Sequence, residues 1–145
     1  MQKEQIFEVL NRNPVFFLAT TEGTEARVRG MLLYKADDSG IVFHTGPGKD
    51  VYKQMINNPT VQMCFYDGEK NIQIRVRGEL ALVEDDSLKA EISSHPTRAF
   101  MQGWKAGCAT EQEFYKMFSV FRLKNGKANV WTFEMNFAPK EDITL

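Results

Sequence analysis

Long apolar runs are missing from these 145 residues. No run approaches the roughly 18 apolar residues that a membrane-spanning helix needs. The first ten residues, MQKEQIFEVL, carry polar side chains where a signal peptide would have its hydrophobic segment. We therefore expect no membrane association and a cytoplasmic location. The length and the 43% of hydrophobic residues suit one globular domain over residues 1–145, with a single core.

Net charge is almost absent as well, because 18 Lys and Arg side chains face 19 Asp and Glu side chains and leave a formal charge of −1. Proteins that bind nucleic acid or anionic membranes by electrostatic attraction usually carry a net or clustered excess of positive charge. The balance argues against both classes of partner. It favours a small-molecule substrate or a protein partner.

Cysteine and histidine are scarce. The two cysteines, Cys64 and Cys108, are not spaced as a metal or redox motif. The only histidines are His44 and His95, and the chain holds neither a His-Glu-x-x-His nor a Gly-x-Ser-x-Gly sequence. These absences argue against a zinc hydrolase and a serine hydrolase. We expect no metal site, and the sequence identifies no catalytic acid or base.

Short β-rich runs separated by turn residues make up most of the chain. Parallel strands need long crossovers, so the tight turns favour an antiparallel sheet, and closing it into a barrel removes exposed edges. The sequence predicts a mainly β fold with peripheral helices. The expected strands are residues 15–21, 26–35, 41–43, 61–66, 71–83, 117–123 and 127–135, and the expected helices are residues 2–12, 49–58, 88–93, 97–104 and 111–116.

Two further expectations concern the C-terminal part. Lys124-Asn125-Gly126 is typical of a tight turn and predicts a hairpin between the last two strands. The polar tail after Asn136 is expected to be irregular.

The stretch from Ile41 to Tyr66 offers a candidate anion site. The apolar run of residues 41–43 is broken by a Gly-Pro-Gly turn that Thr45 precedes, and Lys49 begins a helix whose apolar side holds Val51, Tyr52, Met55 and Ile56. A helix N-terminus exposes backbone N–H groups and carries a partial positive charge, which suits a phosphate. The alternative is an ordinary strand-to-helix connection with a solvated Lys49.

The same turn is not an ATP-binding P-loop. The first glycine of that motif would fall on Phe43, and the magnesium-binding hydroxyl would fall on Asp50. A lone His44 beside the turn is more typical of a hydrogen-bonding residue than of a catalytic base.

Two strands repeat the pattern Arg-x-Arg, at residues 27–29 and 75–77. Alternate residues of a strand point to one face, so each strand presents two guanidinium groups together, and Gln73 shares the face of Arg75. Such groups, together with Lys49, are suited to a polar heteroaromatic ring that carries a phosphate. The alternative is a solvated face on which these arginines pair with glutamates.

The order and spacing of these segments resemble the pyridoxamine 5′-phosphate oxidase-like family of FMN-binding split barrels. The resemblance is carried by RVRGMLL at residues 27–33, VFHT at residues 42–45 with Lys49 four positions on, Asn58-Pro59, and IQIRVRG at residues 72–78. It extends from about Asn13 to Trp131. It implies a six-stranded antiparallel split β-barrel and a homodimer with an FMN in each of two interface sites.

The resemblance also implies roles for individual residues. Arg29 and Lys49 would bind the phosphate, His44 and Thr45 would lie along the ribityl chain or the phosphate, and Gln73 would reach the flavin ring. The remaining implied contacts to the cofactor come from Gly30, Met31, Leu32 and Arg75. Bound FMN would supply the redox chemistry of an oxidoreductase or a flavin-dependent reductase.

Departures from the family pattern concern the substrate more than the cofactor. The oxidases have adjacent Arg-Lys at the phosphate turn, but this chain has Gly48-Lys49, so one cation is missing and weaker FMN binding is expected. Their C-terminal arginine-histidine signature and terminal Arg-Leu-x-Pro are also absent, and Asn136-Phe137-Ala138-Pro139 stands near the end. Pyridoxamine phosphate is therefore not the expected substrate.

Two alternatives to FMN chemistry stay open. A split barrel can use the same cleft for haem or a deazaflavin, with His44 or His95 as an iron ligand. A non-catalytic barrel can bind single-stranded nucleic acid through the Arg-x-Arg strands.

Overall fold

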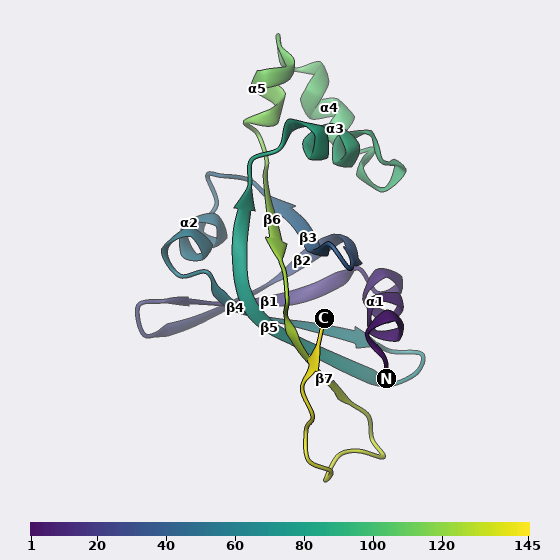
Figure 1. Cartoon of the computed structure of the whole chain (residues 1–145). Helices are drawn as coiled ribbons and strands as arrows, with labels where there is room; N and C mark the ends of the chain where they lie inside the picture. The colour runs from purple at the N-terminus through teal and green to yellow at the C-terminus, as the bar shows by residue number, and fades with distance from the viewer.

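A closed antiparallel barrel forms the centre of the protein in the computed structural model, which describes all 145 residues (Figure 1). The predicted six-stranded split barrel is confirmed. Hydrogen bonding runs around the ring in the order β1-β2-β3-β6-β5-β4 and closes between β4 and β1. The six strands are β1 Val15–Glu22, β2 Glu25–Asp37, β3 Gly40–Thr45, β4 Thr60–Asp67, β5 Ile72–Val83 and β6 Ser119–Leu123.

The barrel interior is filled by aromatic and branched side chains that alternate with outward-facing residues along each strand. Phe16 stacks on Phe65 with 4.8 Å between ring centroids, and Phe43 stacks on Phe121 at 6.0 Å. All four rings are at most 1% exposed. Burying rings of this size contributes much of the apolar stabilisation of a small barrel.

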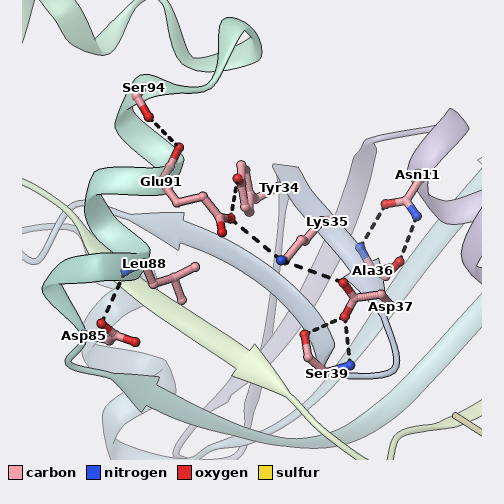
Figure 2. Close-up of polar contacts among 10 residues, drawn as sticks. All are labelled: Asn11, Tyr34, Lys35, Ala36, Asp37, Ser39, Asp85, Leu88, Glu91 and Ser94. Carbon is pink, nitrogen blue, oxygen red and sulfur yellow. Dashed lines mark hydrogen bonds and ion pairs between the residues drawn. The ribbon is translucent and has the colours of Figure 1, made fainter.

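Helix α1 (Lys3–Arg12) adds its apolar side to this core. Ile6 and Leu10 are fully buried, as the sequence pattern predicts. The Asn11 side chain fixes the helix to β2 by two hydrogen bonds with the Ala36 backbone, which accepts from Nδ2 at 2.8 Å and donates to Oδ1 at 2.9 Å (Figure 2). The helix therefore packs in one register.

Strand β2 changes partner along its length. Its first half pairs with β1 up to the Val15–Leu32 pair, and its second half pairs with β3 from the Leu33–Phe43 pair onward, with a β-bulge between Leu33 and Lys35. Residues 29–32 therefore have no strand along the edge that faces β3. β3 continues beyond Phe43 and pairs there with β6. The sheet opens at this point.

Helix α2 (Asp50–Asn57) follows β3 and packs against β1. The predicted apolar side is confirmed for Val51 and Met55, which are buried, but not for Ile56, which is 47% exposed. Gln54 is buried in its place because its amide oxygen accepts a 2.6 Å hydrogen bond from Thr20 Oγ1. The hydrogen bond to Thr20 thus buries Gln54 at a position where the apolar periodicity of the helix predicts Ile56.

A helical insertion separates β5 from β6 and forms the upper part of Figure 1. It consists of α3 (Asp86–Ser94), the 3-10 turn η1 (Pro96–Arg98), α4 (Met101–Ala106) and α5 (Glu111–Tyr115). Its apolar side chains form a second cluster with Val42 and Val120 of the barrel wall. Glu91 on α3 accepts a 2.6 Å hydrogen bond from the Tyr34 hydroxyl and lies 3.7 Å from the Lys35 ammonium, so it holds the insertion against β2 (Figure 2).

The C-terminal strands differ from the predicted hairpin. β6 and β7 (Lys127–Trp131) do not pair with each other, because both pair antiparallel with β5, one after the other along the same edge. The Lys-Asn-Gly segment bends the chain between them, with Asn125 at φ 53°. The tail is not wholly irregular either, since β8 (Ile143–Thr144) pairs with β7. None of the helices is long and apolar enough to span a membrane.

We predict that Gly126→Ala destabilises the fold by about 1–3 kcal/mol through overpacking. A Cβ at residue 126 would lie 2.6 Å from Leu123 Cδ2 and 2.9 Å from Val76 Cγ1, and both side chains are buried. Urea denaturation at one protein concentration measures the change. Gly103→Ala is the matched control, because no atom lies within 4 Å of its added Cβ and alanine favours helix α4. Equal stability of the two variants would contradict the prediction.

Candidate functional site

A cavity of about 560 Å³ lies where β2 and β3 diverge. One side of it is formed by the barrel strands and by the turn before α2, and the other side by the helical insertion and the residues leading into β6. No carboxylate lines it. Its lining consists of Arg29, Gly30, Met31, Leu32, His44, Thr45, Gly46, Lys49, Val51, Phe100, Trp104, Met117 and Phe118.

Arg29 is held by neutral acceptors. Its Nη1 donates to Thr20 Oγ1 at 2.8 Å and to the Leu18 carbonyl at 3.1 Å, and its Nη2 donates to Gln54 Oε1. No carboxylate forms an ion pair with it. Burial, followed by the charge of Arg27, lowers the pKa of Arg29. The guanidinium is therefore fixed in place by neutral groups, with no carboxylate within ion-pair distance.

Lys49 stands at the N-cap of α2 and borders the same cavity. Its backbone N–H donates to the Gly46 carbonyl at 3.1 Å and closes the turn, and its ammonium makes no ion pair. The backbone N–H groups at the start of α2 add a partial positive charge. The structure thus joins the turn, the lysine and Arg29 at one cavity, which is chemically suited to an anion.

His44 and Thr45 end β3 and face the cavity between the two cations and the insertion. Burial first, and then the positive charges of Arg98 and Lys49, lower the pKa of His44 to about 4. The ring is therefore neutral at pH 7. It lies edge-on to Phe118 with 5.8 Å between centroids. His95, the other histidine, lies outside this lining and caps η1, where its Nδ1 is 2.7 Å from Thr97 Oγ1.

The wall opposite the strands is apolar. Phe100 and Trp104 meet edge-on at 5.5 Å, and they are 49% and 40% exposed. Met117, at 42% exposed, and the buried Phe118 complete this wall. None of these four residues was predicted from the sequence to belong to the site. Phe100 and Trp104 are four positions apart on a helical pattern, but nothing in the sequence shows that this face turns toward the strand β2.

Gln73 and Arg75 do not line the cavity. Arg75 lies opposite Cys64 and, one strand further, Phe17, on the outer face of the sheet. Gly30 lies opposite Phe17 on the next strand, so three strand spacings separate Arg75 from Gly30. At roughly 4.8 Å for each spacing, the distance is about 14 Å. Within one chain the structure therefore does not bring Gln73 and Arg75 to the cavity that Lys49 borders, because the two residues project from the outside of the barrel.

The two Arg-x-Arg segments also differ in orientation. Arg29 pairs in register with the fully buried Leu18, whereas Arg75 shares the outer face with Phe17. The other arginine of each segment forms ion pairs with carboxylates. Arg27 pairs with Glu22 and Glu25, and Arg77 pairs with Asp142. The four arginines therefore do not form one basic surface, and the polar-face alternative holds for Arg27 and Arg77.

The sequence model of the pyridoxamine 5′-phosphate oxidase family matches residues 2–132. A pyridoxine/pyridoxamine 5′-phosphate oxidase of Agrobacterium fabrum is 29% identical over 97 residues, which make up 67% of this chain and 47% of that protein. This chain spans about half the length of that relative.

Solved structures show the same fold. A NimC/NimA family protein of Clostridium acetobutylicum superposes with a TM-score of 0.75 at 23% identity, covering 98% of this chain and 92% of the other. A pyridoxamine 5′-phosphate oxidase-related, FMN-binding protein of Nostoc punctiforme gives 0.68 at 18% identity, covering 97% and 87%. The family match, the split barrel and the cationic cavity agree, and the chain belongs to the pyridoxamine 5′-phosphate oxidase family.

Proposed function

We propose that this chain binds FMN in the cavity between β2 and β3, with Arg29 and Lys49 holding the phosphate. One observation carries the proposal: both cations border a cavity that has no carboxylate, and neither of them forms an ion pair. Unneutralised charge at a helix N-terminus is favourable to a phosphate, to which both side chains can donate charge-assisted hydrogen bonds.

The rest of the lining is suited to the other parts of such a ligand. β2 has no strand partner along one edge at residues 29–32, so Gly30, Met31 and Leu32 bring backbone groups to the cavity. Thr45 and His44 add side-chain polar groups beside them. The apolar wall of Phe100, Trp104, Met117 and Phe118 fits a planar ring system, because aromatic ligands pack favourably against aromatic side chains.

The proposed activity is that of an FMN-dependent oxidoreductase or reductase acting on a small molecule. Bound FMN would supply hydride or electron transfer, while the residues of the chain bind it and set the electrostatic potential around it. Pyridoxamine phosphate is not the proposed substrate. The C-terminal arginine-histidine signature and the terminal Arg-Leu-x-Pro of the oxidases are absent, and the apolar wall offers no charged group to a second phosphate.

We further propose a homodimer that uses the outer face of β1, β2 and β4. This face carries Val15, Phe17, Val28 and Tyr66, which are 52–68% exposed. It begins at Gly30, beside the cavity, and extends to Gln73 and Arg75. In a dimer through this face, Gln73 and Arg75 of one copy would approach the cavity of the other, which would give them the cofactor contacts that the family resemblance implies.

The visible absorption spectrum of the purified protein tests the cofactor. FMN is added, unbound flavin is removed, and the spectrum is recorded again. Two retained flavin bands with about one FMN per chain are the expected result. A colourless protein would overturn the proposal in favour of a non-catalytic binding protein, and a Soret band would identify haem.

For the phosphate contact, we predict that Lys49→Ala weakens FMN binding by about 1.5–3 kcal/mol, as expected for loss of a charge-assisted hydrogen bond. Quenching of flavin fluorescence during titration measures the dissociation constant. Lys53→Ala is the control, because it removes the same charge from an exposed position on α2 that does not border the cavity. Unchanged affinity in Lys49→Ala would remove Lys49 from the site.

For the dimer, we predict that Phe17→Glu weakens association by at least about tenfold, because burying an unpaired carboxylate is unfavourable. Light scattering coupled to gel filtration over a range of concentrations measures the mass. Ile56→Glu is the control, since Ile56 is similarly exposed but lies on α2, away from the outer sheet face. A wild-type protein that is monomeric throughout would reject the dimer.

A further inference from the structure

Arg98 is a buried cation with no anionic partner. Its residue is 1% exposed and ends the short turn η1 between α3 and α4. The guanidinium Nη2 donates to the carbonyls of Leu33 at 3.0 Å and Leu32 at 3.4 Å, beside the β-bulge of β2. Nη1 donates to Thr97 Oγ1 at 3.1 Å. Because a buried charge is costly unless its hydrogen bonds are satisfied, these neutral acceptors are essential to it.

The Nε–H group of Arg98 determines the protonation of His44. Nε of Arg98 donates to Nε2 of His44 at 2.8 Å. A guanidinium has no acceptor atom, so Nε2 must offer its lone pair. A neutral imidazole that accepts at Nε2 carries its proton on Nδ1. The Tyr34 ring, 5.5 Å from the guanidinium carbon of Arg98 and itself hydrogen-bonded to Glu91, packs against this arrangement from β2.

The other nitrogen of His44 has no partner and is not fully buried. Nδ1 makes no hydrogen bond within the protein, and it is not one of the two buried side-chain atoms that lack a partner, Arg122 Nε and Asn129 Oδ1. His44 lines the cavity together with Arg29 and Lys49. The N–H group at Nδ1 is therefore available to a ligand.

The charged groups around His44 all disfavour a second proton on the ring. Arg98 approaches from η1 and Lys49 from the turn before α2, while Arg29 borders the same cavity from β2. No carboxylate lines the cavity to offset them. The imidazole therefore stays neutral, with its pKa at about 4, through the range in which a free histidine would titrate.

We propose that Arg98 is a positioning residue that locks His44 as a neutral Nδ1–H donor, so that the site selects a ligand with a hydrogen-bond acceptor at this position. The inference rests on the proposed function, because it concerns the same cavity. Arg29, Lys49 and His44 then present only donors. A phosphate, carbonyl or hydroxyl oxygen is accepted beside His44, and a ligand with a donor there is rejected.

Nitrogen-15 NMR of the ligand-free protein tests the tautomer directly. Long-range correlation spectra distinguish protonated from unprotonated ring nitrogens, and the chain has only two histidines, so the signals lost in His95→Gln are those of His95. We expect His44 to show a protonated Nδ1 and an unprotonated Nε2 at every pH from 8 to 5. A protonated Nε2 at pH 7, or a doubly protonated ring at pH 6, would overturn the inference without any variant.

Arg98→Met tests the positioning role. In this variant we expect both tautomers of His44 and a pKa above that of the wild-type residue, because the charge of Arg98 is gone while burial and Lys49 still lower the pKa. FMN should bind more weakly than to wild type at pH 8 by the reciprocal of the fraction of His44 that carries its proton on Nδ1, about twofold if the two tautomers are equally populated. The difference should shrink toward pH 5, as a growing fraction of the His44 ring in the variant becomes doubly protonated and donates from Nδ1. The FMN phosphate titrates in the same way in experiments with wild type and with Arg98→Met. Its effect therefore cancels in the ratio of the two dissociation constants, and a change of this ratio with pH is due to His44.

Arg122→Met is the matched control, because this arginine lies on β6 and does not line the cavity. It should keep the wild-type tautomer and a constant affinity ratio. A loss of affinity in Arg98→Met that is equal at pH 8 and pH 5 would reduce Arg98 to a structural role. If wild type retains no FMN, the proposed function fails, and the spectra of the ligand-free protein still decide the tautomer.

Discussion

The staggered pairing of β2 is the constraint on which the site depends. This strand is long enough to pair with β1 through its first half and with β3 through its second half, and the two partners lie on opposite edges. The second half of β2 therefore joins β3 in the barrel wall, whereas the edge of its first half that faces β3 has no strand partner. The cavity opens between residues 29–32 on β2 and the end of β3.

The electrostatics of the cavity follow from how its cations are held. Arg29 is fixed by a hydroxyl, an amide and a backbone carbonyl, and Arg98 by carbonyls, a hydroxyl and an imidazole. Neutral acceptors immobilise a guanidinium without cancelling its charge, whereas a carboxylate would do both. The buried residues Thr20 and Gln54 thus contribute to the site although they do not bind the ligand in our proposal. An anionic ligand in the cavity would pair with the positive charges of Arg29 and Lys49, which form no ion pair within the protein.

The helical insertion gives the site its second half. The barrel supplies backbone groups and cations, and the insertion supplies the aromatic wall and Arg98. Its apolar residues form a cluster of their own, separate from the barrel core. Substitutions in the wall can therefore change what fits the cavity without disturbing the stacked phenylalanines inside the barrel.

The sequence by itself determined the local elements and half of the site. Alternating apolar residues and turn signals predicted β1 to β5, and the Gly-Pro-Gly turn pointed to Lys49 as part of an anion site. Residues 29–32, 44 and 45 were implied by the family resemblance, which is carried by two short segments that flank the opening. Only the tertiary structure decided which faces meet. The face on which Gln73 and Arg75 lie depends on strand register around the barrel, and the use of the Lys-Asn-Gly bend depends on β5 being free to pair with both β6 and β7. Arg98 and the aromatic wall reach the cavity from a distant segment through helix packing, because local periodicity carries no information about which distant surface a helix will contact.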